Sequence, residues 1–154
     1  MNKITPDEKI KMVRCMFFKL KEIREDHDLT QNDIGKLLSI SRQNYSRWET
    51  GEKIIPLKHL DTLSNYYQMS FDYLCGLSKE NNYKKSSVDK EKIGKRLKEF
   101  RKENNITQEE LANILNTTHS TISAYESGKT TLLTIFAYEI AKKYNISMDW
   151  ICGK

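Results

Sequence analysis

Proline, glycine and cysteine are scarce in this sequence. Its 154 residues include 2 prolines and 6 glycines, a composition that favours helices over loop-rich or all-β folds. The 3 cysteines, Cys15, Cys75 and Cys152, make an odd count without a CxxC pair, so we expect neither a disulfide framework nor a zinc site. This cysteine usage is typical of a reducing compartment, and we expect a cytoplasmic protein.

Long apolar stretches are also missing. The first residues hold no apolar core that could act as a signal peptide, and no segment approaches the roughly 18 apolar residues of a membrane span. No Cys/His cluster, glycine-rich phosphate loop or Ser/His/Asp arrangement stands out. We therefore expect no membrane association, metal, cofactor, small-molecule ligand or enzymatic activity. The net charge of +5 suits a polyanionic partner but is too mild to identify one.

What the sequence does contain is an internal duplication. Leu29-Thr30-Gln31 recurs as Ile106-Thr107-Gln108, at an offset of 77 residues (107 − 30). The same offset, without a gap, relates the Leu-Lys-Glu triplets at 20–22 and 97–99 and the Cys-Gly pairs at 75–76 and 152–153. A period this long indicates a duplicated domain rather than a solenoid repeat.

The segment between the two copies is polar and almost free of apolar residues. It covers residues 78–90, and we interpret it as a linker. The first domain is then expected at residues 1–77 and the second at 91–154. Each would be close to the lower size limit for folding on a core of its own.

Helix signals come in the same order in both copies. Apolar residues spaced three and four apart from Val13 onward predict a first helix that ends near Asp28. Thr30 and Ser41, with Thr107 and Thr118 in the second copy, suit the N-cap positions of helices two and three. Tyr45 and Trp48 in one copy, and Ile122 and Tyr125 in the other, form the expected buried side of helix three.

Later signals complete five helices per copy and no sheet. Gly51 and Gly128 suit the left-handed position that closes helix three. Helix four is predicted over roughly 57–67 in the first copy and 131–144 in the second. A short fifth helix would begin after Ser70 and after Ser147, and end at the following glycine.

Two short capped helices with so tight a turn between them are typical of a helix-turn-helix. The pattern resembles the phage-repressor family called Cro/cI or XRE, through Leu20…Arg24…Leu29-Thr30-Gln31…Leu38…Trp48-Glu49…Gly51 and its copy from Leu97 to Gly128. The resemblance implies an all-α protein of two tandem five-helix, lambda-repressor-like helix-turn-helix domains. It also implies a sequence-specific regulator of transcription, by family habit a repressor, whose partner is double-stranded DNA.

In that family helix three lies in the major groove, and its outward residues touch base edges. The resemblance assigns this role in the first copy to Arg42, Gln43, Asn44, Ser46 and Arg47. Arginine can bond guanine O6 and N7 together, and glutamine or asparagine can do the same for adenine N6 and N7. The second copy has shorter and mostly uncharged side chains, and we expect it to be the weaker base reader: His119, Ser120, Thr121, Ser123 and Ala124.

Four further residues are candidates for contacts with the DNA backbone. Gln31 and Gln108 begin helix two, where the family's glutamine bonds a phosphate and braces a side chain of helix three. Lys53 and Lys129 follow the glycine turn and could reach a phosphate. The alternative in each case is a surface residue without a role.

Two pairs of charged residues resemble the family's structural ion pair. Arg24 with Glu49, and Arg101 with Glu126, would join the first helix to the end of helix three and fix the angle at which that helix is presented. The alternative is a set of unpaired surface charges.

Two alternatives concern the whole protein. An apolar face around Leu132, Leu133, Ile135, Phe136 and Ile151 could make the second repeat a homodimer contact instead of a DNA reader. The first arrangement predicts an asymmetric operator read by both repeats, and the second a palindromic site read by two chains. A protein-binding module on the same fold, such as an antitoxin, also stays open.

Overall fold

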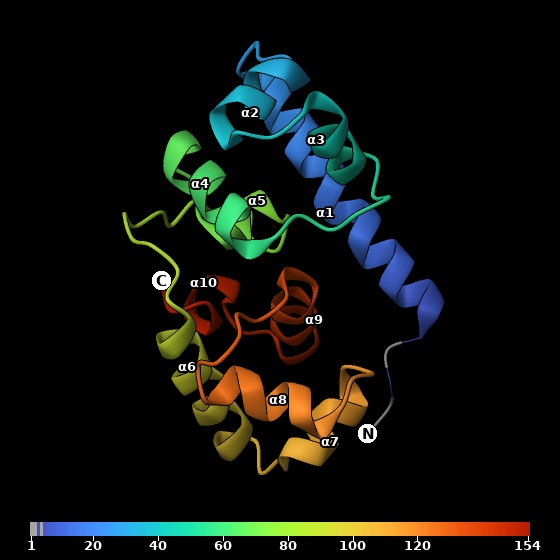
Figure 1. Ribbon diagram of the computed structural model, residues 1–154, viewed down its shortest axis with the longest axis vertical. Helices are drawn as coiled ribbons and strands as arrows, with labels where there is room; N and C mark the ends of the chain where they lie inside the picture. The colour runs from blue at the N-terminus through green and yellow to red at the C-terminus, as the bar shows by residue number, and fades with distance from the viewer. Residues whose placement is uncertain (1–2, 4) are drawn as a thin grey trace. The chain divides into compact units, whose positions relative to one another are not determined.

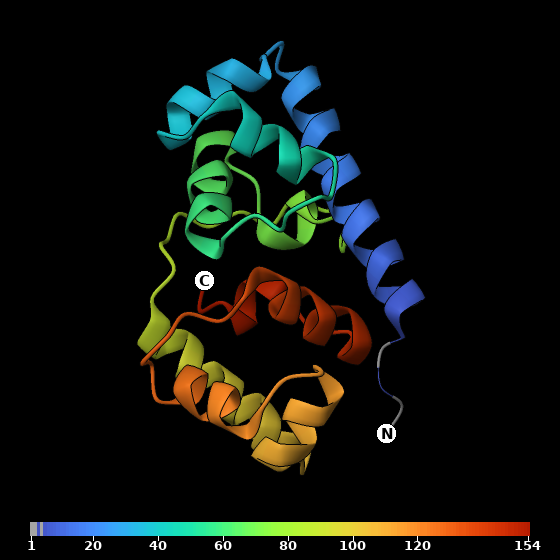
Figure 2. The same cartoon turned by 45° about the vertical axis from the view of Figure 1, so that its right-hand side comes forward.

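The computed structural model describes Lys3 and residues 5–154, apart from the side chains of Met12, Cys15, Phe17 and Phe18. In this described part the protein is all-helical, with ten helices and no strand, which confirms the all-α prediction (Figures 1 and 2). It divides into two compact units, whose main segments are Lys9–Lys85 and Ser86–Lys154. The expectation for Cys15 lies outside the described side chains, while Cys75 and Cys152 are buried thiols.

Each unit contains two longer helices, two short ones with a tight turn between them, and a final single turn. The first five are α1 (Pro6–Asp26), α2 (Gln31–Leu38), α3 (Arg42–Glu49), α4 (Leu57–Tyr67) and α5 (Phe71–Leu74). The second five are α6 (Lys90–Glu103), α7 (Gln108–Ile114), α8 (His119–Glu126), α9 (Thr134–Tyr144) and α10 (Met148–Ile151).

The structure repeats at the offset found in the sequence. Helices α3 and α8, α4 and α9, and α5 and α10 begin and end 77 residues apart (119 − 42, 134 − 57, 148 − 71). Residues with positive φ recur at the same offset in five pairs: Asp28 and Asn105, Ser39 and Asn116, Gly51 and Gly128, Gln68 and Asn145, Gly76 and Gly153. The two units therefore share their turns as well as their helices.

The predicted caps of helices two and three are confirmed. Thr30 and Asp33 form a reciprocal capping box at the start of α2, and Thr107 and Glu110 form another at the start of α7. The hydroxyl of Ser41 accepts a hydrogen bond from the Asn44 N–H, and Thr118 caps α8 in the same way. These caps satisfy free N–H groups and fix where each helix begins.

Helix α1 begins at Pro6, about two turns before Val13, the first residue of the predicted apolar pattern. A capping box explains this start. The Thr5 hydroxyl accepts a hydrogen bond from the Glu8 N–H at 3.2 Å, and the Glu8 carboxylate accepts one from the Thr5 N–H at 2.8 Å. The sequence signal was Thr5-Pro6-Asp7-Glu8, with proline at the first helical position.

The predicted start of helix four in the second copy is wrong. Helix α9 begins at Thr134, not at residue 131. Leu132 is buried, as is its counterpart Ile55 in the first unit. The chain inserts this side chain into the core first, and Leu133 then keeps an extended backbone, with φ −66° and ψ 138°.

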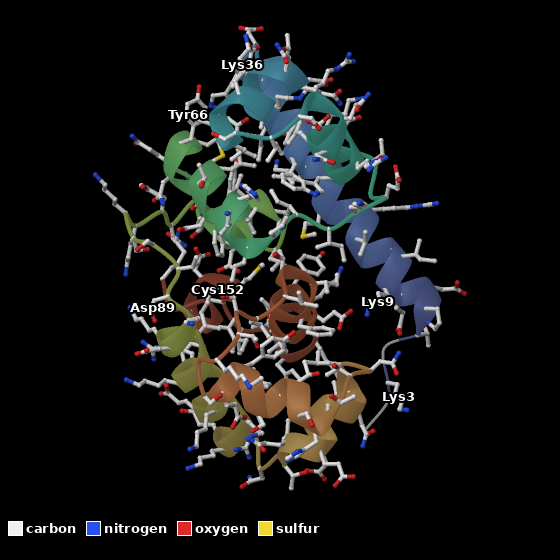
Figure 3. The ribbon with its side chains drawn as sticks, in the orientation of Figure 1. Lys3, Lys9, Lys36, Tyr66, Asp89 and Cys152 are labelled. Carbon is white, nitrogen blue, oxygen red and sulfur yellow. The ribbon has the colours of Figure 1, made fainter. Side chains whose placement is uncertain are left out.

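The aromatic residues of helix three pack inward, as predicted. Tyr45 and Ile122 are fully buried, and Trp48 and Tyr125 are 7% and 5% exposed. Tyr45 and Trp48 meet edge to face, with ring centroids 6.1 Å apart. Figure 3 draws the side chains on the ribbon, among them Lys36 on α2 and Tyr66 on α4, which are exposed. Packing of the aromatic face leaves the opposite face of α3 exposed.

A glycine lets α6 and α8 approach each other closely. A Cβ placed on Gly94 would lie 2.4 Å from the Tyr125 carbonyl oxygen and 2.8 Å from that of Glu126. Real Cβ atoms do not come this near to backbone oxygens, so the position accepts glycine alone without a backbone shift. The contact fixes the end of α8 against α6.

The predicted linker is partly bound to the first unit. The Asn81 carboxamide accepts a hydrogen bond from the Ser70 N–H and donates one to the Gln68 carbonyl, both at 2.9 Å. The Tyr83 hydroxyl donates to Asn65 Oδ1 at 2.9 Å. Residues up to Lys85 accordingly belong to the first compact unit.

Four of the five apolar residues expected to form a self-association face are buried in this chain. Leu132, Ile135, Phe136 and Ile151 are at most 7% exposed, whereas Leu133 is 53% exposed. Along the described residues, no helix combines the length and the apolar character needed to cross a bilayer.

Candidate nucleic-acid interface

A tight turn joins α2 to α3 in the first unit. Ser39 adopts a left-handed conformation at φ 55°, and the Ile40 N–H donates a hydrogen bond to the Gly35 carbonyl at 2.9 Å. A Cβ on Gly35 would lie 3.0 Å from the Ile40 carbonyl oxygen, so only a small residue fits there. The second unit has Ala112 at this position and the left-handed Asn116 in its turn. The turn sets the direction in which α3 and α8 leave the preceding helix.

A buried cluster of Arg24, Gln31 and Glu49, here called the ion-pair cluster, joins α1, α2 and the end of α3. Arg24 forms a two-point contact with the Glu49 carboxylate, with Nε to Oε1 at 2.6 Å and Nη2 to Oε2 at 3.1 Å. Its remaining Nη1 donates to the Leu29 carbonyl at 2.6 Å. Gln31 Nε2 donates to Glu49 Oε2 at 3.0 Å. Because the Arg24 and Glu49 side chains are only 9% and 2% exposed, the alternative of unpaired surface charges is wrong.

The electrostatics of the ion-pair cluster follow from its contacts. Burial alone would raise the pKa of Glu49, but hydrogen bonds from Arg24, Gln31 and Tyr45 outweigh it and hold that pKa below its usual range. The hydrogen bonds that Arg24 donates to Glu49 in turn raise the pKa of Arg24. Both groups stay charged, so the contact fixes the end of α3 against α1.

The second unit repeats the cluster with Arg101, Gln108 and Glu126. Arg101 Nε lies 2.6 Å from Glu126 Oε1, and Nη2 lies 3.2 Å from Oε2. Gln108 Nε2 donates to Glu126 Oε2 at 2.8 Å. The side chains of Arg101 and Glu126 are 15% and 4% exposed. Both helix-three elements are therefore held at their C-terminal ends by the same arrangement.

The outward face of α3 brings five of the predicted contact residues together. Arg42, Gln43, Asn44 and Arg47 are exposed and Ser46 is half-buried. A surface cavity of about 460 Å³ is lined by Gln31, Arg42, Gln43, Ser46 and Arg47. Asn44 and Lys53 are exposed but do not line this cavity. The cavity combines the N-terminus of α2, which attracts anions, with two arginines.

The outward face of α8 is exposed but chemically different. His119, Ser120 and Ser123 are exposed, and Thr121 and Ala124 are half-buried. The hydroxyl of Thr121 is within 2.9 Å of the Thr118 hydroxyl, so part of its hydrogen-bonding capacity serves the cap. Lys129, after the glycine turn, is exposed. This face carries fewer donors than that of α3.

The structure shows the brace on helix three that was expected of Gln31 and Gln108, because their amide nitrogens donate to the carboxylates of Glu49 and Glu126. A second amide hydrogen remains for another acceptor, and the expected phosphate contact stays a prediction. Sequence reasoning passed over Glu52, whose Oε1 lies 3.6 Å from Arg47 Nε. The available signal for Glu52 was an acidic residue directly after the glycine turn that closes α3.

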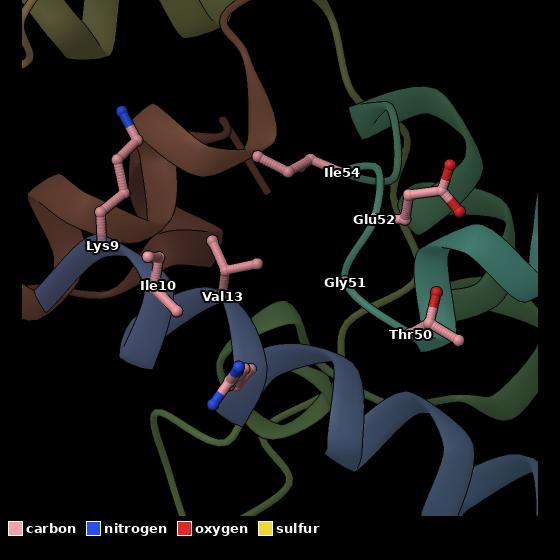
Figure 4. Close-up of a pocket in the computed structure, with 8 residues that line it drawn as sticks. Lys9, Ile10, Val13, Thr50, Gly51, Glu52 and Ile54 are labelled. Carbon is pink, nitrogen blue, oxygen red and sulfur yellow. The ribbon is translucent and has the colours of Figure 1, made fainter. Parts of the chain in front are cut away.

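A second cavity of the first unit, of about 510 Å³, lies between α1 and the turn after α3. Figure 4 shows its apolar side chains, Ile10, Val13 and Ile54, with the backbone of Gly51 at its edge. Ile10 is 52% exposed, which is unusual for so large an apolar side chain. The early start of α1 is what places Ile10 here.

Comparisons with known proteins agree with this geometry. The helix-turn-helix family of the XRE type matches the chain twice, at residues 20–74 and 97–151. These two ranges contain both ion-pair clusters and both tight turns. No solved structure matches the chain significantly.

Two curated relatives share parts of the sequence. "Uncharacterized HTH-type transcriptional regulator YobD" of Bacillus subtilis (strain 168) is 32% identical over 82 residues, which are 53% of this chain and 67% of that protein. "Antitoxin PezA" of Streptococcus pneumoniae serotype 4 (strain ATCC BAA-334 / TIGR4) is 36% identical over 63 residues, or 41% of this chain and 40% of PezA. The match therefore spans less than half of PezA.

Proposed function

The chain belongs to the XRE-type helix-turn-helix family, and from this premise we propose that it is a sequence-specific, double-stranded DNA-binding regulator of transcription, acting as a repressor. Its relative YobD carries the name of a transcriptional regulator of the same type. The proposal includes two DNA-binding domains, residues 1–77 and 91–154, joined by 78–90. It also includes a cytoplasmic location.

One observation carries the proposal: α3 holds its aromatic residues in the core and its arginines at the surface. Tyr45 and Trp48 are buried, while Arg42, Gln43 and Arg47 line an open cavity on the other side of the helix. The ion-pair cluster fixes the helix in that orientation. A helix presented in this way can enter a major groove, where arginine and glutamine pair with guanine and adenine edges.

The two repeats have different parts in this proposal. The first is the stronger base reader, through Arg42, Gln43, Asn44, Ser46 and Arg47, with Gln31 and Lys53 at the phosphates. The second reads fewer base edges, through His119, Ser120, Thr121 and Ser123, with Gln108 and Lys129 at the backbone. Because the two faces differ, the preferred operator has two unlike halves.

Selection of bound sequences from random duplexes tests the proposal directly. The full chain should recover one preferred sequence, and Arg42→Ala and Arg47→Ala should each relax the preference at one base pair, with a loss of about 1–3 kcal/mol on that site. Lys79→Ala is the matched control, because it removes one positive charge from an exposed position outside both helix-turn-helix motifs.

Two results would contradict the proposal. One is a wild-type protein that recovers no sequence above the background of the random pool. The other is a pair of arginine variants that lose no more affinity than Lys79→Ala. Equal losses would mean that the positive charge of the chain matters but the face of α3 does not.

The match to PezA favours a second candidate, a protein-binding antitoxin on the same fold. In that case the chain would co-purify with the product of an adjacent gene and suppress its toxicity on co-expression. A homodimer through the second repeat is compatible with either function, and its exposed apolar residue is Leu133. Sedimentation of wild-type protein and Leu133→Ser, with and without the selected duplex, measures this contact.

A further inference from the structure

An acidic side chain lies beside one of the arginines proposed to read DNA. Glu52 Oε1 is 3.6 Å from Arg47 Nε, within ion-pair range but too long for a good hydrogen bond. The two side chains are 62% and 44% exposed, so water and salt reach both of them. A carboxylate at the edge of an interface for a polyanion repels phosphates. Affinity for DNA therefore does not explain why Glu52 lies beside Arg47.

The backbone turn after α3 brings Glu52 to this place. Gly51 takes φ +77°, and the Lys53 N–H donates to the Arg47 carbonyl at 3.0 Å, so the chain folds back along the last turn of α3. Figure 4 shows the Glu52 carboxylate turned away from Ile10 and Val13 of the neighbouring cavity. Glu52 is one of the residues that line this cavity, and its Oε1 lies 3.6 Å from Arg47 Nε.

The second repeat provides an internal comparison. It has the same turn, with Gly128 at φ +73° and the Thr130 N–H donating to the Ala124 carbonyl at 3.3 Å. The positions equivalent to Arg47 and Glu52 are Ala124 and Lys129 (47 + 77, 52 + 77). Since both repeats have this turn, its geometry does not require an acidic residue after the glycine. The first repeat has both the arginine and the glutamate, and the second repeat has neither at the equivalent positions.

We propose that Glu52 is a selectivity residue that acts through Arg47, by competing with DNA phosphates for the guanidinium. This inference rests on the proposed function of the α3 face. Non-specific binding is mainly electrostatic, so a guanidinium already paired with a carboxylate gains little from a stray phosphate. A base edge with two acceptors offers Arg47 a directional two-point contact, which a single carboxylate contact at 3.6 Å does not match. Glu52 thus weakens binding to unrelated DNA more than binding to the operator.

Glu52→Gln in the full chain tests this role, with affinity measured on the selected duplex and on an unrelated duplex of equal length and composition. Affinity for the unrelated duplex should rise about three- to fivefold, and that for the selected duplex less than twofold. The salt dependence on unrelated DNA should steepen by about 0.9 in log–log slope, because Arg47 becomes available to about one more phosphate.

Glu22→Gln is the charge-matched control, since Glu22 is also exposed and pairs with Lys19 on α1 at 3.4 Å. It should leave the ratio of the two affinities unchanged. In an Arg47→Ala background, Glu52→Gln should no longer alter binding to unrelated DNA. A control that acts as strongly as Glu52→Gln, or an effect that persists without Arg47, overturns the inference.

Failure of the proposed function gives a different result. A wild-type chain that binds both duplexes equally, or neither, overturns the base-reading role and the inference together. A wild-type chain that is selective, with an unchanged affinity ratio in Glu52→Gln, overturns the role of Glu52 alone.

Discussion

The amide nitrogen of Gln31 donates a hydrogen bond to Oε2 of Glu49, 3.0 Å away, on the side of the carboxylate that also receives Arg24 Nη2. A residue at the start of α2 is in this way connected to the end of α3. The glutamine is half-buried, so it can serve the cluster and still face outward. The Glu49 carboxylate consequently contributes both to the stability of the first unit and to the orientation of α3.

Glu49→Ala should destabilise the first unit by about 3–5 kcal/mol, because it leaves the buried Arg24 without its partner. The chain has two tryptophans, Trp48 in the first unit and Trp150 in the second. In a Trp150→Phe background, denaturant unfolding followed by Trp48 fluorescence should shift to lower denaturant. Glu126→Ala in the same background is the control and should leave the Trp48 transition in place. An unshifted transition in Glu49→Ala would show that the ion-pair cluster contributes nothing.

The ion-pair cluster should also make stability depend on acid pH. The pKa of Glu49 is lowered in the folded state, so its stabilisation is fully present above the unfolded-state pKa of about 4.3 and is lost as pH falls through the folded value. Between about pH 5 and pH 2, wild type should therefore lose more stability in the first unit than Glu49→Gln. Denaturant midpoints measured along this range test the sign. Parallel curves for the two proteins would contradict it.

Two glycine-to-alanine changes should act in opposite ways. Gly94→Ala forces a Cβ to within 2.4 Å of the Tyr125 carbonyl oxygen and should cost about 1–3 kcal/mol in the second unit, although alanine ordinarily favours a helix. Gly35→Ala should be neutral or stabilise the first unit by up to about 1 kcal/mol, because Ala112 already occupies the equivalent position. Fluorescence of Trp150 reports the first change and that of Trp48 the second. A tolerated Gly94→Ala would mean that α6 and α8 can separate freely.

Asn81→Ala should loosen the segment after α5 and destabilise the first unit by roughly 1–2 kcal/mol, because it removes two hydrogen bonds. The Ser70 N–H that it leaves unpaired belongs to a residue only 3% exposed. Limited trypsin digestion should cut faster at Lys79, Lys84 and Lys85. The neighbouring, exposed Asn82→Ala is the control and should keep the wild-type rate. Equal cleavage of all three proteins would contradict the role of Asn81.

Local signals in the sequence predicted most of the fold correctly. Threonine and serine caps and left-handed glycines act within four residues, so Thr30, Ser41 and Gly51 and their copies fixed the helix ends without knowledge of the tertiary structure. Thr5 and Glu8 form a capping box of the same local kind, so the start of α1 at Pro6 could also have been predicted from the sequence. The constant offset then transferred the caps and the closing glycine to the second unit.

Features that depend on tertiary contact were not predictable in this way. The need for Gly94 follows from carbonyl groups 31 and 32 residues further along the chain (125 − 94, 126 − 94). The start of α9 is a different case, because the constant offset gives Thr134 from Leu57 (57 + 77) and the prediction of residue 131 departed from that offset. Arg42, Gln43 and Arg47 line one surface cavity, and their contact with DNA stays a prediction. The family resemblance supplied the brace of Gln31 on helix three, whereas the position of Glu52 beside Arg47 depends on side-chain directions that spacing alone does not specify.

Each unit carries its own complete ion-pair cluster, with contacts of nearly equal length in both. Exchange of exposed residues on α3 or α8 therefore leaves the support of either helix intact. The outward faces of α3 and α8 can thus be changed independently of each other. Substituting Arg, Gln and Arg at positions 119, 120 and 124 should therefore give the second repeat the base preference proposed for the first. The ion-pair cluster of Arg101, Gln108 and Glu126 would need no change.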